Sequence, residues 1–122
     1  MKIVEMNEGR KIDYKLTGTK LEFADGALTV DLERYQSDDP VTRDIMVDSE
    51  GYLVMGKGSY YVAQVEIPAR EYEETEVAET LKEDAEETGG MSDMPSILRT
   101  PLPLDTEKVT LCLFGIDGIM IR

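Results

Sequence analysis

The sequence predicts an all-β protein, a single antiparallel β-sandwich or partly open barrel of roughly eight to ten short strands. Two observations predict this class: turn signals recur at short spacing, and the segments between them alternate between apolar and polar residues. A third observation, a concentrated run of acidic residues, predicts a long acidic hairpin or loop insertion. Because 122 residues are enough for one domain and few for two, we expect a single β domain over residues 1–122.

The turn signals predict five hairpins. Each contains a glycine together with asparagine, aspartate or threonine, residue types that suit the backbone angles of tight turns. The pair Asp25-Gly26 is a favoured sequence for a two-residue hairpin loop, because both positions need a positive φ. The five turns lie at residues 6–10, 17–19, 25–26, 48–51 and 117–118.

The segments between the turns alternate as strands with one buried face do. In residues 11–16, for example, Ile12, Tyr14 and Leu16 share one face and charged residues share the other. Other rows predicted to face the core are Leu21 and Phe23; Leu28, Val30 and Leu32; Tyr61, Ala63, Val65 and Ile67; and Val109, Leu111 and Leu113. Segments 45–47, 111–114 and 119–121 are apolar on both faces, which fits either central strands between two layers or contact with another subunit.

One segment, residues 68–103, departs from this pattern. Its two flanks look extended and carry prolines, which are tolerated at strand edges and in exposed chain. Residues 71–93 hold ten of the 26 acidic residues and a single base, Lys82; without them, 16 acidic against 12 basic residues leave a net charge of −4 instead of −13. A run of like charge cannot bury itself, so we expect the flanks to be the arms of a long hairpin with an acidic, flexible insertion at 71–95.

The acidic tip has some features of a short helix. Thr80 and Glu83 fit a capping box, and Val77, Leu81 and Ala85 fall on one helical face. However, the apolar stripe is thin, and isolated helices shorter than about 12 residues are marginal in water. Glutamates also crowd at three- and four-residue spacing. We therefore expect disorder or a weakly ordered turn of helix here unless a partner orders it.

Missing residue types restrict the chemistry. The chain has no histidine, the commonest general acid–base group and transition-metal ligand, and its single cysteine, Cys112, rules out an intramolecular disulfide. Because Cys112 lies in an apolar run, we expect a buried, inert thiol. No segment has the apolar length of a signal peptide or a membrane span, so we expect a cytoplasmic protein with no membrane partner. The net charge of −13 argues against direct binding to nucleic acid.

Clustered carboxylates raise the possibility of a calcium site, which the spacing does not support. An EF-hand loop starting at Asp48 would place Tyr52 and Leu53 where a ligand and a glycine are needed. Asp48 and Glu50 are better explained as turn residues, because an aspartate side chain bonds the backbone of the turn that it begins. We therefore predict no metal site and no bound cofactor.

Other candidate motifs are incomplete. Residues 56–59, Gly-Lys-Gly-Ser, lack the full phosphate-loop pattern, and no helix is expected after them. The pair Tyr60-Tyr61 is most simply an edge of the core, with an aromatic binding platform as the alternative. No serine nucleophile motif is present, and among 26 acidic residues some pair will always lie at a suitable distance. We therefore predict no catalytic residue.

These observations favour a non-enzymatic structural, assembly or protein-interaction module. We expect a homo-oligomer whose β body packs against copies of itself or a larger partner, with the segment 68–103 making the inter-subunit contact. By architecture alone, small β domains with long hairpins resemble building blocks of phage virions and tails. The residues predicted to contact the partner are Tyr72, Glu73, Glu74, Glu76, Glu79, Glu83, Glu86, Glu87, Ile97 and Leu98.

Three alternatives stay open. The first is an acidic inhibitor or DNA mimic that occupies a basic groove, which would need carboxylates spaced along a rigid surface. The second is a small-ligand carrier with an apolar barrel interior. The third is that the acidic segment is a solvated loop that only maintains solubility.

Overall fold

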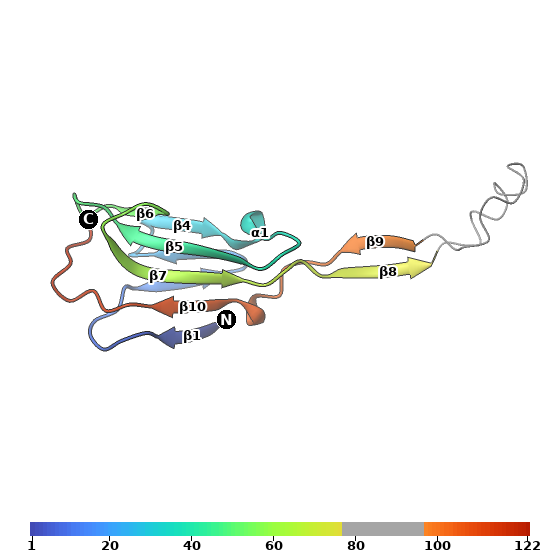
Figure 1. Ribbon diagram of the computed structural model, residues 1–122, viewed down its shortest axis with the longest axis horizontal. Helices are drawn as coiled ribbons and strands as arrows, with labels where there is room; N and C mark the ends of the chain where they lie inside the picture. The colour runs from blue at the N-terminus through green and yellow to red at the C-terminus, as the bar shows by residue number, and fades with distance from the viewer. Residues whose placement is uncertain (77–96) are drawn as a thin grey trace, which may run out of the picture. The chain divides into compact units, whose positions relative to one another are not determined.

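The computed structural model describes residues 1–76 and 97–122 (Figure 1). These residues form ten strands and two short helical segments, so the all-β class is confirmed. The strands belong to sheets of five, three and two strands, and none of these described sheets closes into a barrel. The chain divides into two compact units: Met1–Arg70 with Leu104–Arg122, here called the body, and Glu71–Pro103, here called the hairpin unit.

The larger sheet of the body has five strands in the order β1-β10-β7-β5-β6. They are β1 (Lys2–Glu5), β5 (Val41–Val47), β6 (Leu53–Met55), β7 (Tyr60–Ile67) and β10 (Thr110–Leu113). Three of the four neighbouring pairs are antiparallel, but β1 and β10 run parallel. The prediction of a purely antiparallel domain was therefore wrong at this edge. Strands β1 and β10 are distant in the sequence, so no tight turn forces them to run in opposite directions.

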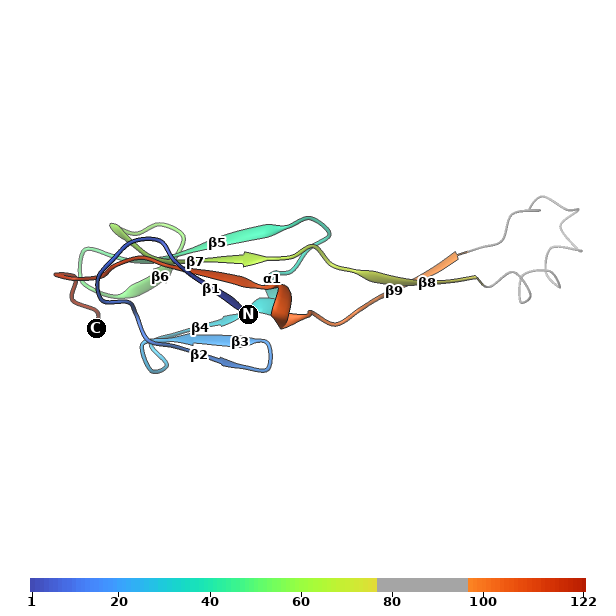
Figure 2. The ribbon, with the colours of Figure 1, turned by 90° about the horizontal axis from the view of Figure 1, so that it is seen from below.

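The smaller sheet of the body is an antiparallel meander of β2 (Tyr14–Thr17), β3 (Lys20–Phe23) and β4 (Leu28–Asp31). Figure 2 shows it as a second layer beside the five-stranded sheet. The predicted alternation holds in β3, where Leu21 and Phe23 are fully buried and Lys20 is exposed. Burial of one face therefore sets the orientation of this sheet.

One hydrophobic cluster joins the two sheets of the body. Phe23 and Val30 contribute to it from the smaller sheet, and Ile45, Val65 and Leu111 contribute from the larger one, all with no exposed surface. Full burial of side chains of this size stabilises a fold by about 1.5–3 kcal/mol each. The apolar rows that the sequence places inward therefore form the core in most positions.

The predicted inward row of β7 is wrong at Tyr61, which is 51% exposed. The register shifts between Ile45 and Met46 of β5: Ile45 pairs with Ala63, whereas Met46 pairs with Tyr61. Val62 is thus the extra residue of a β-bulge, and it is fully buried beside Ala63. A bulge changes the phase of the alternation, so Tyr61 turns out of the core.

Three of the five predicted hairpins form, at residues 17–19, 25–26 and 48–51. The turn at Asp25-Gly26 is longer than the predicted two-residue loop, because Phe23 pairs with Leu28. Ala24 and Asp25 adopt positive φ angles of 52° and 55° before Gly26 at 93°. Four-residue loops also connect hairpin strands, and the sequence signal does not distinguish them from two-residue loops.

The other two predicted hairpins do not form. Residues 6–10 connect β1 and β2, which belong to different sheets. Residues 117–118 do make a turn, but the flanking segments 114–116 and 119–121 are not strands. Their apolar character is explained by the core, because Ile116 is buried and Ile119 and Ile121 pack against the hydrophobic cluster.

Helical structure is limited to α1 (Leu32–Tyr35) and the 3-10 segment η1 (Thr106–Lys108) in the residues described. In η1 the carboxylate of Asp105 caps the first turn by accepting a hydrogen bond from the N–H of Glu107 at 3.0 Å. No helix within residues 1–76 or 97–122 is long enough and apolar enough to cross a membrane.

The hairpin unit contains the antiparallel strands β8 (Tyr72–Glu76) and β9 (Ile97–Pro101). The two flanks of the predicted insertion therefore pair with each other, as expected of the arms of one hairpin. The acidic centre of the insertion and its predicted turn of helix fall in residues 77–96, outside the described residues. That the chain is a single domain over 1–122 stays a prediction.

Candidate interaction site

The β8–β9 ribbon has no buried side chain in residues 71–75 and 97–103. Only Tyr72 is half-buried there, while the large aliphatic residues Ile97 and Leu98 are 58% and 54% exposed. An isolated two-stranded ribbon is at best marginally stable in water, because it has no hydrophobic face to bury. The ribbon thus exposes large apolar side chains at Ile97 and Leu98.

The side chain of Arg99 contacts two residues of the opposite strand. Its guanidinium carbon lies 4.3 Å from the centroid of the Tyr72 ring, and its Nε lies 3.6 Å from Oε1 of Glu74. Both side chains of this ion pair are more than half exposed, so the pair contributes no more than about 1 kcal/mol. Glu74 lies directly opposite Arg99 in the register, so these contacts favour the observed register.

The two exposed aliphatic side chains lie on opposite faces of the ribbon, because successive residues of a strand alternate. Leu98 pairs with Thr75 on one face, and Ile97 shares the other face with Arg99. Neither face is therefore a continuous apolar surface. Both residues belong to β9, and the outer edge of this strand, facing away from β8, lies between their two side chains.

The backbone hydrogen bonds of the ribbon define which groups of β9 point inward. The N–H of Leu102 donates to the carbonyl of Glu71 at 2.8 Å, which makes these two residues a hydrogen-bonded pair. In an antiparallel ribbon such pairs recur at every second residue. The backbone groups of Thr100 and Leu98, which are two and four residues before Leu102, therefore also point toward β8.

The alternate residues of β9 turn their backbone groups outward. These are Ile97 and Arg99, each with one N–H and one carbonyl, and Pro101, which has a carbonyl only. The ribbon has two strands, so within the described part of the chain no third strand covers this edge. An uncovered strand edge of this kind is a template for pairing with another chain.

The structure brings six of the ten predicted contact residues into this ribbon: Tyr72, Glu73, Glu74, Glu76, Ile97 and Leu98. The other four, Glu79, Glu83, Glu86 and Glu87, lie outside the described residues. That any of the ten contacts a partner stays a prediction. The sequence-based set omitted Arg99, whose side chain contacts both Tyr72 and Glu74 across the ribbon. A signal for it existed, because Arg99 is the only base in residues 97–103 and stands in the arm opposite a run of glutamates.

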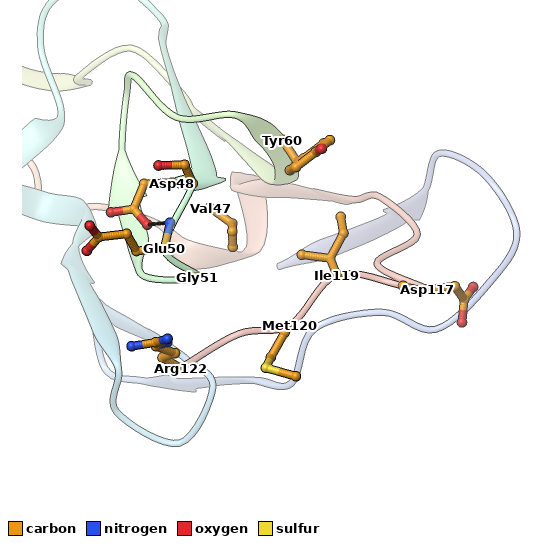
Figure 3. Close-up of a pocket in the computed structure, with 11 residues that line it drawn as sticks. Val47, Asp48, Glu50, Gly51, Tyr60, Asp117, Ile119, Met120 and Arg122 are labelled. Atoms are coloured by element: carbon orange, nitrogen blue, oxygen red, sulfur yellow. Dashed lines mark hydrogen bonds between the residues drawn. The ribbon is translucent and has the colours of Figure 1, made fainter.

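A second surface feature is an open hollow of about 610 Å³ in the body (Figure 3). The hollow lies between the β5–β6 turn, the start of β7 and residues 117–122, and its lining includes Asp48, Tyr60, Met120 and Arg122. Figure 3 shows the carboxylates of Asp48 and Glu50 gathered at one side and Met120 at the other. The hollow thus combines acidic and apolar groups, which raises the question of whether its acids are available for chemistry.

Of the carboxylates that line the hollow, those of Asp48 and Asp117 accept hydrogen bonds from backbone N–H groups. Oδ1 of Asp48 accepts hydrogen bonds from the N–H groups of Glu50 at 2.9 Å and Tyr52 at 3.0 Å, which confirms its predicted role as a turn residue. Oδ2 of Asp117 accepts a hydrogen bond from the N–H of Arg10 at 2.9 Å. Among residues 1–76 and 97–122, no three acidic or cysteine side chains are grouped so that they would hold a metal ion. The carboxylates of Asp48 and Asp117 therefore fix loops.

The last residues of the chain are held in the hollow by the β5–β6 turn. The N–H of Arg122 donates to the carbonyl of Gly51 at 2.8 Å, and the Arg122 guanidinium lies 5.6 Å from the Tyr52 ring centroid. Gly51 has a φ of 94°, and a Cβ atom there would lie 2.9 Å from the carbonyl oxygen of Met120. Only glycine satisfies both the backbone conformation and this close approach.

The predicted alternatives for Tyr60-Tyr61 were an edge of the core and an aromatic platform. Both rings are more than half exposed, at 58% and 51%. Tyr60 lines the hollow, whereas the Tyr61 ring packs at a centroid distance of 5.7 Å from the Phe114 ring. The two rings therefore serve different surfaces and do not form one platform.

Cys112 is buried, as predicted, with 6% of its surface exposed. Burial raises the pKa of this thiol above its ordinary value of 9.0, and the negative charge of Glu66 raises it further, while Lys2 acts in the opposite direction. A thiol with a raised pKa carries little thiolate at neutral pH and is a poor nucleophile.

Comparisons with known proteins identify no relative. The sequence matches no protein-family model, no curated protein and no solved structure. The function of this protein is therefore argued from its own surfaces.

Proposed function

We propose that this protein is a non-enzymatic assembly module that self-associates through its hairpin unit. The observation that carries the proposal is the β8–β9 ribbon, which has no core of its own and exposes Ile97, Leu98 and the edge of β9. Strand edges of this kind bind other chains through main-chain hydrogen bonds. Self-association would give the ribbon the additional strands that stable β structure needs.

The proposed assembly unit has a β-sandwich body. The five-stranded and three-stranded sheets share one hydrophobic cluster, and Figure 2 shows them as two layers. Fully buried residues of both layers, such as Phe23 and Val65, support this architecture. The sandwich would act as the rigid part of each subunit.

The chemistry of the body supports an assembly role over catalysis. The carboxylates of Asp48 and Asp117 are engaged by backbone N–H groups, and the single thiol is buried with a raised pKa. A general base or nucleophile must reach its substrate in a reactive protonation state. None of these three groups meets that requirement in the described structure.

The carboxylates of β8 suit self-association better than the DNA-mimic alternative. Glu73 and Glu74 are adjacent in the strand and therefore point to opposite faces. Glu74 is also paired with Arg99 in its own ribbon. A mimic of a phosphate backbone needs a row of carboxylates along one surface, which these two residues do not provide.

The test is the solution mass of the full chain, measured by sedimentation over a range of protein concentrations. We expect a concentration-dependent dimer, and we expect association to strengthen with salt, because a net charge of −13 on each copy opposes association. The double variant Ile97→Ser/Leu98→Ser should weaken the dimer roughly tenfold or more, since it removes two exposed apolar side chains from the ribbon.

The matched control is Met120→Ser, which removes an apolar side chain that is 79% exposed on the body. This variant should leave the mass unchanged at every concentration. A wild-type chain that stays monomeric at high concentration would contradict the proposal, and so would equal weakening by the control variant.

A further inference from the structure

We infer that β9 of one copy pairs with β9 of a second copy, antiparallel and across a two-fold axis at Leu98. The inference rests on the self-association proposed above and adds the strand edge and the register that make the contact. The product would be a four-stranded sheet in the order β8-β9-β9-β8.

Charge distinguishes the two edges of the ribbon. Strand β8 carries glutamates and no base, with Glu73 and Glu74 among its exposed side chains. Strand β9 carries one base, Arg99, and no acid. Direct pairing of β8 with β8 would set glutamates about 5 Å apart in neighbouring strands, where like charges are destabilising. Strand β9 has no acid, so pairing β9 with β9 avoids this repulsion between glutamates.

The same argument favours a closed dimer over head-to-tail growth. Adding β9 of one copy to β8 of the next would bring successive β8 strands within two strand spacings, about 10 Å, and would leave an open-ended sheet. Pairing β9 with β9 places the two β8 strands three spacings apart, about 14 Å, where repulsion between their glutamates is weaker and more strongly screened than at about 10 Å. The glutamate-bearing β8 edges would then face solvent and disfavour addition of further strands.

The backbone determines the register. Within β9, as described over Ile97–Pro101, only Ile97 and Arg99 turn an N–H outward. Pairing Ile97 with the partner's Arg99, and Arg99 with the partner's Ile97, therefore uses all four of these donors in the two copies. Moving the axis to Arg99 would set two arginines opposite each other. It would also pair Ile97 with the partner's Pro101, which has no N–H to donate. The axis at Leu98 avoids both defects.

In this register the Leu98 side chains of the two copies meet on one face. They form a non-hydrogen-bonded pair, in which the Cα atoms are about 4.5 Å apart and the side chains are in contact. This contact would bury a side chain that is 54% exposed in the single chain. Arg99 would remain in place over Tyr72 and beside Glu74 of its own copy.

The register is tested by disulfide cross-linking of the full chain. In Leu98→Cys the two Cα atoms would lie within the 4.4–6.8 Å that disulfides usually span, so mild oxidation should give a covalent dimer. The matched control is Thr75→Cys, which pairs with Leu98 across the ribbon but would lie about 14 Å from its copy. Thr75→Cys and the wild-type chain, whose Cys112 is buried, should stay uncross-linked.

A second test separates the backbone of β9 from its side chains. Ile97→Pro removes an N–H that points away from β8, so the ribbon itself keeps its hydrogen bonds. Ile97→Ala removes the side chain and keeps that N–H. By sedimentation, Ile97→Pro should dimerise roughly tenfold or more weakly than Ile97→Ala, because two of the four bonds between copies are lost.

The outcomes separate this inference from the proposed function. A wild-type dimer that is weakened by Ile97→Ser/Leu98→Ser, yet gives no cross-link at Leu98→Cys, would overturn β9 pairing and leave hairpin-mediated association in place. Cross-linking of Thr75→Cys as fast as Leu98→Cys would also overturn it, and so would large sedimenting species that indicate head-to-tail growth. Absence of any self-association would overturn both.

Discussion

The body and the hairpin unit are both built mainly from antiparallel strand pairs, but different interactions order them. In the body, residues such as Leu21, Val62 and Leu111 are fully buried, and a one-residue slip of their strands would move them out of the core. In the hairpin unit, no side chain of residues 71–75 or 97–103 is buried. Its register is supported by hydrogen bonds and by contacts of Arg99 with Tyr72 and Glu74. The hairpin unit thus pairs its strands without burying side chains in the described residues, and this is the region where we propose that a partner binds.

The largest expected difference between the two regions comes from truncating one apolar side chain in each. Phe23→Ala should lower the free energy of unfolding by about 3–5 kcal/mol, because the ring is fully buried and leaves a cavity. Leu98→Ala should change it by less than about 0.5 kcal/mol, since more than half of that side chain is already exposed. Urea unfolding of dilute, monomeric protein followed by circular dichroism measures both. Comparable losses of unfolding free energy in the two variants would contradict the proposed difference between the body and the hairpin unit.

Glycine substitutions test whether the turns of the body are equally constrained by tertiary contacts. Gly51→Ala should cost about 2–4 kcal/mol, because it combines a φ of 94° with a Cβ 2.9 Å from the carbonyl oxygen of Met120. Gly18→Ala has a φ of 60° but no atom within 4 Å of the new Cβ, so about 1 kcal/mol is expected. Thermal unfolding of the two variants measures this difference. Equal losses of stability would mean that Gly51 does not pack against Met120 as described.

Thiol reactivity compares a buried position of the body with an exposed position of the hairpin unit. Cys112 should react with a disulfide reagent at neutral pH roughly 100-fold more slowly than the new thiol of Leu98→Cys, because reaction requires the body to open. Equal rates would show that β10 is not protected as its burial indicates.

The pH dependence of stability gives the smallest expected effect. The pKa of Cys112 is raised in the folded chain, so the unfolded chain loses its thiol proton first as pH rises. The contribution of Cys112 to stability is therefore complete below its ordinary pKa of 9.0 and declines above it. Denaturant unfolding between pH 7 and pH 10 should show a steeper decline for the wild type than for Cys112→Ala. Parallel declines in the two proteins would contradict this assignment.

Local sequence signals predicted the elements of the fold whose cause is local. Alternation identified β3 and β4, and glycine-containing turns identified three hairpins, because both signals arise from neighbouring residues. The parallel pairing of β1 with β10 and the bulge at Val62 had no such signal. The apolar segment at 119–121 looked like a strand although it packs against the core without forming one.

The sequence likewise predicted only part of the candidate site. Proline-bearing flanks and concentrated charge marked residues 68–103 as exceptional, and six of the predicted contact residues lie on β8 or β9. The position of Arg99 between Tyr72 and Glu74, and the outward backbone groups of Ile97, depend on the register between two strands. Register is a property of the paired strands and cannot be obtained from either strand alone.

By itself, the sequence determined that the chain forms β structure and that its negative charge gathers in one segment, because backbone propensity and like-charge repulsion act between residues close along the chain. Tertiary structure alone decided which strands became neighbours, where the alternation of β7 changes phase and which backbone groups of β9 point away from β8. These features depend on contacts between residues far apart in the sequence, and such contacts are selected by how well the whole core packs.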